Sequence, residues 1–349
     1  MRRIIFTILL LPLALFSREI DTFYGPIEVE EPLLLELIDC PAMQRLKEIH
    51  QYGVSYYTTH REEYSRYDHS LGVFVILRAK GCSLKEQVAG LLHDVSHTIF
   101  SHVGDWMFNL EYQEKDYQNQ IYCQFLRKRG VADILEKYGI SVEDIEPTGE
   151  LFPALECSLP NLCADRLDYN IQGAYHQRFL THDEAMELLE SLEFNGSIWV
   201  SDRPDLMKKL VQFSLFMSED CWGSPRNHFQ SRYLADAILR ALDLGALSIE
   251  DVHFGADQVV WNMLKSHSDP VIRNNMLLLE GDKQLFTYVE AGSADQIIRA
   301  KFRGVDPWIQ TEEGVFRICE LDPDLASQYQ STKDRFEIGW PIKVCLNKE

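Results

Sequence analysis

The 349-residue sequence predicts a mainly α-helical protein with a small β-hairpin and a short mixed α/β portion at its C-terminal end. Apolar residues recur mostly at helical spacing from about residue 31 to 192, and again over roughly residues 204–242. Short apolar alternations at 315–318 and 342–346 are typical of strands. Since 46% of the residues are hydrophobic and 25% are charged, the chain can bury a sizeable core.

The N-terminal segment resembles a secretion signal. Arg2 and Arg3 precede an uncharged run from Ile4 to Phe16. This run is shorter than the roughly 20 residues that a membrane span needs, but it fits the apolar core of a signal peptide. We therefore predict an exported or periplasmic mature chain that begins near Arg18 and has no membrane span. The alternative is a retained hydrophobic helix packed on a cytoplasmic domain.

Two consecutive helices are expected before residue 100. The first runs from about residue 69 to 80, because Gly81 is a normal C-terminal stop. The second begins after Ser83, which forms a capping-box pattern with Glu86. Apolar residues at helical spacing then follow as Leu84, Val88, Leu91, Leu92 and Val95.

Pro160 and Asn161 are expected to open another helix. Four polar residues at offsets of a helical turn share one of its faces: Asp165, Asp168, Tyr169 and Gln172. The Asn195-Gly196 pair, between apolar alternations, predicts a β-hairpin. The sequence contains no internal repeat and no low-complexity linker. We predict that the chain is divided into a leader over residues 1–17, a main domain over 18–242 and a C-terminal extension over 243–349.

The charge balance restricts the partners. The chain has 54 Asp and Glu against 34 Lys and Arg, a net charge of −20. Such a surface repels phosphate backbones, so we expect no nucleic-acid polymer as a partner. A small anionic substrate is compatible, because a local cation or metal overcomes a diffuse field at short range. The eight scattered cysteines form no Cys-x-x-Cys pair, which favours buried thiols over a zinc knuckle or redox motif.

Histidines gather in one part of the sequence. Four of the eleven lie between Asp68 and Asp105: His69, His93, His97 and His102. A His-Asp dipeptide alone means little, because His182-Asp183 is a second such pair without supporting residues. The pair His93-Asp94 differs, since it ends the predicted amphipathic helix and two further histidines follow it.

These residue types suit a divalent-metal site. Two neutral imidazoles and two carboxylates would supply nitrogen and oxygen donors, neutralise the ion and leave positions for water and a phosphate oxygen. Such mixed ligation suits Mn, Fe, Co, Ni or Zn better than Ca, with Mg also admissible. A metal of this kind lowers the pKa of bound water towards about 7. His97 and His102, about one and two helical turns after His93-Asp94, could bind phosphate or protonate a leaving group. Ordinary hydrogen-bonded histidines are the alternative, which we favour for any single residue but not for the set.

Three motifs resemble a known family. The stretch Ser65–Val73 (Ser-Arg-Tyr-Asp-His-Ser-Leu-Gly-Val) is similar to the first metal-ligand motif of the HD-domain deoxynucleotide triphosphohydrolases, which include the mammalian SAM-and-HD-domain enzyme and bacterial relatives. His93–His102 resembles their second motif and Asp165–Tyr169 their last. The similarity covers roughly residues 20–173 and continues more weakly to about residue 242. It implies a helical HD-domain bundle and a metal-dependent phosphohydrolase.

The resemblance also implies a role for each matching residue. Four match metal ligands: His69, His93, Asp94 and Asp165. Three match the catalytic residues of the family: His97 and His102 would face the phosphates, and Asp105 would support the catalytic histidine. Four match substrate contacts: Gln51 at the sugar 3′-hydroxyl, Arg66 on the nucleotide, Arg166 on the phosphates in place of a lysine, and Tyr169 near the sugar.

The sequence departs from the family at positions where family members bind the substrate. Residues 114–117 lack the His-Glu pair that follows the second motif, and Gly173 replaces a carboxylate near the sugar. Residues 215–222 lack an Arg, His and Tyr trio that grips triphosphate and sugar. Because discrimination depends on such polar partners, dNTPs are expected to be poor substrates compared with another phosphate compound.

We favour hydrolysis of a phosphoester or phosphoanhydride bond in a nucleotide or another small phosphorylated compound through a metal-activated water. The first alternative is a dNTP triphosphohydrolase of the dGTPase type. The second is a catalytically silent metal-binding HD domain that acts as a sensor or binding module. Family members are often oligomeric, so a homo-oligomer stays open.

Overall fold

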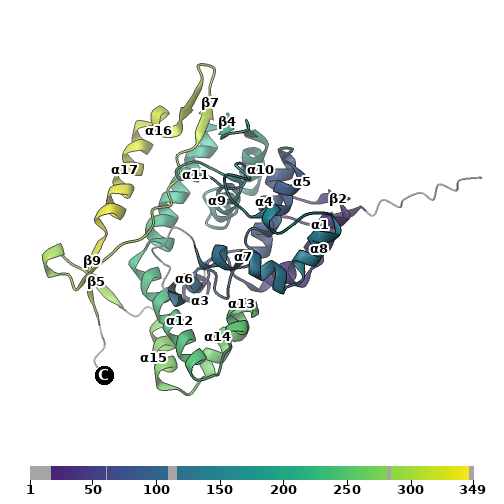
Figure 1. The fold of residues 1–349 in the computed structure, drawn as a ribbon. Coiled ribbons are helices and arrows are strands. Elements are labelled where there is room, and N and C mark those ends of the chain that lie inside the picture. Colours follow the sequence, from purple (N-terminus) through teal and green to yellow (C-terminus); the bar gives the residue numbers. More distant parts are fainter. Residues whose placement is uncertain (1–16, 60, 109–115, 281–283, 346–349) are drawn as a thin grey trace, which may run out of the picture.

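Helices dominate the fold, which confirms the predicted mainly α class with small β elements (Figure 1). The structure is a computed structural model that describes residues 17–59, 61–108, 116–280 and 284–345. Its α-helices are α1 (Pro32–Asp39), α2 (Pro41–Arg45), α3 (Val54–Thr59), α4 (Arg66–Ala79), α5 (Leu84–Leu92), α6 (Val103–Met107), α7 (Tyr117–Lys128), α8 (Val131–Lys137), α9 (Ala164–His176), α10 (His182–Ser191), α11 (Pro204–Met217), α12 (Pro225–Asp243), α13 (Ile249–Phe254), α14 (Asp257–Ser266), α15 (Pro270–Leu279), α16 (Ile318–Leu321) and α17 (Pro323–Ile338).

Shorter helical turns and strands complete the described residues. The turns are η1 (Leu46–Glu48), η2 (Glu143–Ile145), the π-helical η3 (Ser218–Trp222) and η4 (Ala291–Ser293). The strands are β1 (Arg18–Ile20), β2 (Ile27–Val29), β3 (Leu192–Phe194), β4 (Trp199–Ser201), β5 (Phe286–Tyr288), β6 (Gln296–Ile298), β7 (Trp308–Gln310), β8 (Val315–Arg317) and β9 (Trp340–Val344). Except for Ser17, the predicted leader lies outside the described residues.

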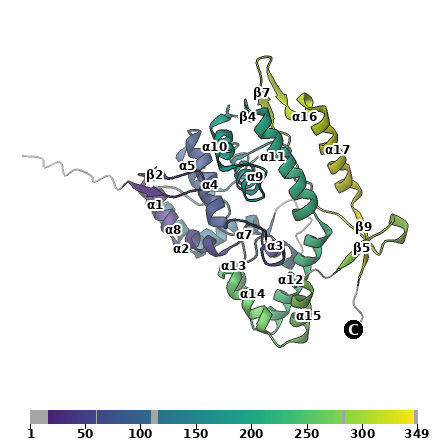
Figure 2. The same cartoon turned by 180° about the vertical axis from the view of Figure 1, so that it is seen from behind.

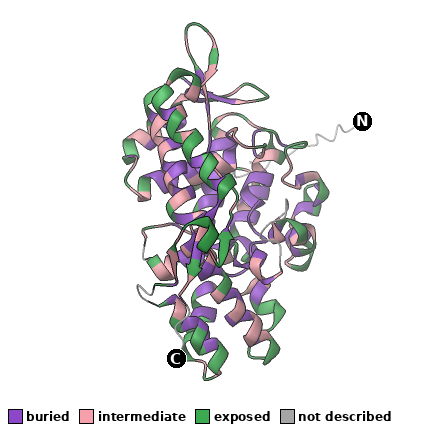
Figure 3. Ribbon diagram, turned by 90° about the vertical axis from the view of Figure 1, so that its left-hand side faces the viewer, coloured by how far each residue is buried: buried purple, intermediate pink, exposed green. Residues whose placement is uncertain are grey.

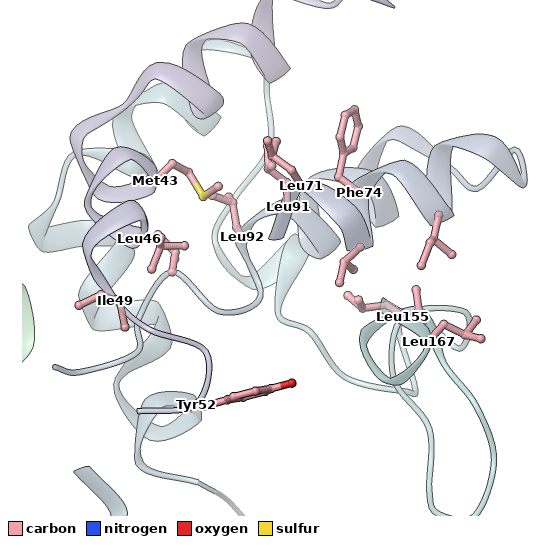
Figure 4. Close-up of a cluster of buried hydrophobic side chains, with 14 of the residues drawn as sticks. Met43, Leu46, Ile49, Tyr52, Leu71, Phe74, Leu91, Leu92, Leu155 and Leu167 are labelled. Carbon is pink, nitrogen blue, oxygen red and sulfur yellow. The ribbon is translucent and has the colours of Figure 1, made fainter. Parts of the chain in front are cut away.

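Helix α4 is the central element of the core. It packs against α5 and α9, and most of its residues are buried. Figure 4 shows Leu71 and Phe74 of α4 in one apolar cluster with Leu91 of α5 and Leu167 of α9. Burying one such side chain contributes about 1.5–3 kcal/mol, so this cluster holds the three helices together. Figure 3 shows the same pattern for the whole fold, with buried residues on the inner faces of the helices.

A glycine permits the close approach of α4 and α9. A Cβ atom on Gly72 would lie only 1.9 Å from Asp168 Oδ1 and 2.7 Å from Gln172 Nε2. Any larger residue would therefore push α9 away from α4. The close packing places the polar face of α9 directly beside the buried side of α4.

The helix starts follow local capping chemistry. Helix α4 begins three residues before the predicted start, because Ser65 and Asp68 form a reciprocal capping box that the sequence analysis did not use. In α5, Ser83 accepts a hydrogen bond from the Glu86 backbone N–H at 3.2 Å, as expected. The Glu86 carboxylate, however, accepts from the Ala154 backbone N–H at 3.1 Å, so it supports a neighbouring loop as well.

The predicted helix over 204–242 is two helices, α11 and α12, separated by η3 and Gly223. Pro225 lacks a backbone N–H and fits only the first turn of a new helix. Ser224 caps that turn by accepting from the Asn227 backbone N–H at 3.1 Å. A Cβ atom on Gly223 would meet the Phe336 ring at 2.4 Å, so the break also admits α17. Helix α9 likewise begins at residue 164, later than the predicted 160–161.

The C-terminal portion returns to the main body through β-pairing. The predicted hairpin is formed by β3 and β4, with Gly196 in the left-handed region at φ 93°. Strand β7 adds to β4 in parallel and β8 pairs with β7, giving the order β3-β4-β7-β8. A second sheet of this portion has the order β5-β9-β6, and β1 and β2 pair with each other near the N-terminal end. Helix α17 packs along α11 at the outer edge (Figures 1 and 2).

One apolar core runs through most of the fold. Its buried residues extend from Ile20 to Leu325, so the region after residue 243 packs on the same core as the region before it. The domain boundary after residue 242 stays a prediction. None of the helices that the structure describes has the length and apolar character to cross a membrane. All eight cysteines are free thiols.

Candidate metal centre and adjoining pocket

Three elements bring the predicted metal ligands together. His69 lies on α4, His93 closes α5, and Asp165 lies in the first turn of α9. The two imidazole Nε2 atoms are 3.2 Å apart. Asp165 Oδ1 lies 3.0 Å from Nε2 of His69 and 3.4 Å from Nε2 of His93. Ligand atoms about 2.1 Å from a common ion have separations of this size.

The outer nitrogens of both histidines are held by hydrogen-bond acceptors. Nδ1 of His69 lies 2.6 Å from Asp168 Oδ2, and Nδ1 of His93 lies 2.8 Å from the Gly90 carbonyl oxygen. Each Nδ1 therefore carries the proton that it donates, so that each ring, in its neutral form, presents the lone pair of Nε2. Two lone pairs at 3.2 Å repel each other unless a cation lies between them. The donor set thus fits a metal ion, and the outer contacts are those usual for metal-bound histidines.

Asp94 lies beside this three-residue group. Its carboxylate oxygens are 3.5 Å from His93 Nε2 and 3.6 Å from His69 Nε2. It also accepts a hydrogen bond from the Arg66 guanidinium and lies 3.3 Å from His97 Nε2. Asp94 is thus close enough to complete the predicted ligand set while its charge is shared with Arg66.

The electrostatics of the cluster favour positive charge. Burial alone would lower the pKa of His69, but hydrogen bonds to Asp165 and Asp168 raise it to about 10. Burial opposes ionisation of Asp94, yet the Arg66 guanidinium holds its pKa well below the usual range. The pKa of Asp165 is likewise lowered, against its burial, by hydrogen bonds to His69 and His93. Anionic carboxylates around two imidazoles are the charge pattern expected of a cation site.

The two predicted catalytic histidines, His97 and His102, lie on an irregular loop between α5 and α6. Helix α5 ends at Leu92 and α6 begins at Val103, so the predicted helical spacing of His97 and His102 is wrong. Phe100 and Ser101 adopt left-handed backbone angles, with φ of 56° and 55°. Such a turn is unfavourable for residues other than glycine and needs external support.

Asp257, from the start of α14, supplies part of this support. Its fully buried carboxylate accepts hydrogen bonds from the backbone N–H groups of Phe100 at 2.6 Å and His50 at 3.0 Å. Burial raises its pKa to about 6. Arg66 Nε also donates to Ser101 Oγ at 2.9 Å. Sequence reasoning missed Asp257, because it lies more than 150 residues beyond the loop that it holds.

His102 and Asp105 form a polar pair beside the metal group. His102 Nδ1 lies 3.0 Å from Asp105 Oδ2, and Asp105 Oδ1 accepts from the Tyr117 backbone N–H at 2.7 Å. The His102 side chain is 44% exposed, whereas that of His97 is 3% exposed. Burial, together with the nearby Arg66 charge, lowers the pKa of His97 to about 4. His102 is therefore the histidine that solvent or a ligand can reach.

A cavity of about 190 Å³ adjoins the metal group. Five of the predicted site residues line it: Gln51, Arg66, His102, Asp105 and Tyr169. The Tyr169 ring lies 6.4 Å from the His69 ring, and Asp165 keeps 23% of its side chain exposed. Tyr169 and Arg66 thus connect the cavity to the metal group, whose Asp165 is partly exposed.

Arg166 is placed differently from the other predicted contacts. Its guanidinium pairs with Glu156 at 3.0 Å and donates to the Asn161 carbonyl oxygen at 3.1 Å, and it does not border the cavity. A charge-assisted bond to Glu156 draws it towards the loop before α9. The structure instead brings three other cations to the cavity, namely Arg299, Lys301 and Arg303. In the sequence, the available signal for this cluster was a cation at every second position from Arg299 to Arg303.

Comparison with known proteins agrees with this geometry. Residues 66–148 match the HD domain family. The chain is 36% identical over 328 residues to the uncharacterized protein YdhJ of Bacillus subtilis, covering 93% of this chain and 98% of that protein. It is 32% identical over 266 residues to the metal-dependent phosphohydrolase cns2 of Cordyceps militaris, covering 74% and 76% of the two chains.

A more local similarity links the chain to a triphosphohydrolase. It is 30% identical over 145 residues to the human deoxynucleoside triphosphate triphosphohydrolase SAMHD1, which covers 36% of this chain and only 23% of that protein. The long matches to YdhJ and cns2, together with the HD-domain match, extend the similarity over most of the chain. The chain therefore belongs to the HD-domain family of metal-dependent phosphohydrolases.

Proposed function

We propose that the protein hydrolyses a phosphoester or phosphoanhydride bond in a small phosphorylated compound, with nucleotides as the first class to test. One observation carries the proposal. Two imidazole lone pairs and the Asp165 carboxylate converge within 3.4 Å of one another beside a cavity that contains His102 and Arg66. Such a set can hold a cation and a phosphate group side by side.

The ligand set proposed for the ion is His69, His93, Asp94 and Asp165. When bound, a divalent ion would activate a water molecule and polarise a phosphoryl oxygen. Mixed nitrogen and oxygen ligation favours Mn, Fe, Co, Ni or Zn. Asp168 and the Gly90 carbonyl keep the two imidazoles in the tautomer that presents Nε2 to the ion.

His102 is the proposed proton donor to the leaving group. Asp105 accepts from its Nδ1, which orients the ring, and the remaining nitrogen is free to face the cavity. Arg66 holds Asp94 and also borders the cavity, so it can contact a phosphate oxygen. His97 is buried beside Asp94, so its proposed role is to support that ligand.

A panel assay tests the proposal. Purified protein is incubated with Mn²⁺ and nucleoside mono-, di- and triphosphates, cyclic nucleotides and generic phosphomonoesters and diesters. The expected result is metal-stimulated release of phosphate, pyrophosphate or triphosphate from at least one class. This release should be lost in His93→Ala and kept in His182→Ala, the matched control from the unsupported His-Asp pair. A complete lack of turnover across the panel would favour the sensor alternative.

The dNTP triphosphohydrolase alternative is supported by the motif resemblance and by the local match to SAMHD1. The Arg, His and Tyr trio and the sugar-facing carboxylate of that family are missing here, although Gln51 and Tyr169 are kept, so we expect weak selection for dNTPs. Release of inorganic triphosphate from each dNTP is the deciding product. A kcat/KM near 10⁴ M⁻¹s⁻¹ or above, the order of ordinary enzymes, would establish that alternative instead.

A further inference from the structure

A cationic strap borders the cavity next to the metal centre. We use this name for residues 299–303, which join β6 to β7. The strap carries Arg299, Lys301 and Arg303 at every second position, and all three line the cavity. In an extended segment, alternate side chains point to the same side. The spacing therefore gathers three positive charges at one wall.

The strap is fixed at both ends. On one side β6 pairs with β9, with Ile298 opposite Trp340. On the other side the Val305 backbone N–H donates to Ser214 Oγ of α11 at 3.3 Å, and the Asp306 N–H donates to the Pro160 carbonyl at 3.0 Å. Pro160 lies shortly before α9, which carries Asp165. The strap is thus tied to the helix that supplies a predicted metal ligand.

Phe302 and Ala300 of the strap pack against the apolar core. The Phe302 ring packs edge-on against Tyr329 and lies 5.3 Å from the Phe336 ring. Ala300 packs against the same apolar cluster and also borders the cavity. Burying Phe302 holds the strap in register, because a shift by one residue would turn the cations into the core.

The three cations carry no neutralising partner among the residues that the structure describes. The ion pairs and hydrogen bonds there leave Arg299, Lys301 and Arg303 unmatched, although the chain has 20 more acidic than basic residues. Arg303 lies near Tyr169, where its charge, after that of Arg166, opposes the burial-driven rise of the Tyr169 pKa. Tyr169 in turn lies beside His69.

Carboxylates of the cavity lie with His102 rather than with the strap. Asp105 and Asp116 are 3.0 Å and 3.8 Å from His102 Nδ1. The remaining wall contains aromatic and neutral polar side chains, including Trp222 and Asn227. Unpaired cations at the edge of an acidic protein's cavity need an anion to neutralise them, and a local cluster can dominate the diffuse repulsion.

Building on the proposed function, we propose that the cationic strap is a second anion subsite, which binds a phosphate group of the substrate other than the one hydrolysed. The substrate class is then a compound with at least two phosphate groups, such as a nucleoside polyphosphate or a bisphosphate. Recognition by charge explains how a chain without the family's Arg, His and Tyr trio can hold an oligophosphate. It also predicts little discrimination between ribose and deoxyribose.

The test measures anion binding separately from turnover. Full-length protein is titrated with inorganic tripolyphosphate, pyrophosphate and phosphate by calorimetry. The double variant Arg299→Gln/Lys301→Gln changes two exposed side chains, and adding Arg303→Gln removes the third charge. Arg273→Gln on α15, an exposed arginine away from the cavity, is the matched control. Circular dichroism and Tm confirm that each variant is folded.

Tripolyphosphate affinity is expected to fall about tenfold for each charge removed. It should also weaken with added salt and be unchanged in Arg273→Gln. Equal affinity in the wild type and the double variant would overturn the proposal. KM values for a nucleoside triphosphate and a simple monoester are compared in parallel. Strap variants should raise the first and spare the second.

The two proposals fail in different ways. Tripolyphosphate binding that depends on the strap, without turnover of any phosphate compound, would refute the hydrolase and leave the subsite. Turnover of polyphosphates with an unchanged KM in the triple variant would refute the subsite and leave the hydrolase.

Discussion

Asp168→Asn isolates the support of the metal centre from the ligands themselves. The Asp168 carboxylate is fully buried and has three partners: His69 Nδ1 at 2.6 Å, the Tyr24 hydroxyl at 3.0 Å and Gln172 Nε2 at 3.0 Å. Asparagine has the same shape but only one acceptor oxygen. If that oxygen accepts from His69, the new amide group faces the Gln172 amide, donor against donor. If the amide group faces His69 instead, the proton moves to Nε2 and blocks the metal lone pair.

Either arrangement weakens the site by a calculable amount. Loss of a supporting partner of a metal-bound histidine typically costs 10–100-fold in metal affinity, which is about 1.4–2.8 kcal/mol. We expect this loss for Mn²⁺ or Zn²⁺ measured by competition with a chelating dye. Asp183→Asn, at the exposed second His-Asp pair, is the matched control. A metal Kd within about twofold of the wild type in Asp168→Asn, with the fold intact, would refute the tautomer argument.

Three further predictions follow from the fold. Gly72→Ala should lower both Tm and metal affinity, because the new Cβ would lie 1.9 Å from Asp168 Oδ1. The control Gly292→Ala, whose Cβ would meet nothing within 4 Å, should lower neither. Unchanged Tm and metal Kd in Gly72→Ala would contradict the close contact of α4 and α9. Asp257 has a folded-state pKa of about 6, above its ordinary 3.8, so its contribution is most favourable below about pH 4 and is lost as pH rises through 6. Asp257→Asn should therefore gain on the wild type by up to about 3 kcal/mol between those limits in urea unfolding, whereas a pH-independent difference would argue against a buried ionising carboxylate. For the N-terminal segment we propose export, so the mature chain from the native host should begin near Arg18 on N-terminal sequencing; a cytosolic chain that retains Met1 would overturn this.

The helical class and the hairpin could be predicted because they depend on local patterns. Apolar spacing along α4, α5 and α9 and the Asn195-Gly196 turn are visible in short windows of sequence. The break between α11 and α12 could have been predicted from Gly223 and Pro225. The π-helical η3 before it has no such local signal in the sequence.

The predicted metal ligands and the missed strap show the same difference between local sequence patterns, which could be predicted, and long-range contacts, which could not. His69, His93, Asp94 and Asp165 stand in dense, ordered motifs, so their chemistry and spacing pointed to a common site. The structure brings them together, although their roles stay predictions. The cationic strap begins 130 residues after the last motif, at 299 against 169, and is held at the cavity by pairing of β6 with β9 and by packing on α11. Long-range contacts of this kind leave little trace in a single sequence.

Arg166 lies apart from the other predicted substrate contacts. Its position in a motif predicted a phosphate contact, whereas the structure pairs it with Glu156 outside the cavity. A charged side chain takes the strongest partner within reach, and that partner comes from a loop whose path the motif does not specify. Its predicted role remains open to an Arg166→Gln test within the same phosphate panel.

The most direct test of the account is the metal content of the purified protein. Elemental analysis of the wild type should give about one transition-metal ion per chain, as expected of one ligand set. Asp94→Ala should lose the ion and keep most of its helical content, because apolar packing and not the metal holds α4, α5 and α9 together. Asp183→Ala should retain the ion. Undiminished metal in Asp94→Ala, or a wild type that binds none when supplied with Mn²⁺ or Zn²⁺, would contradict the proposed metal centre.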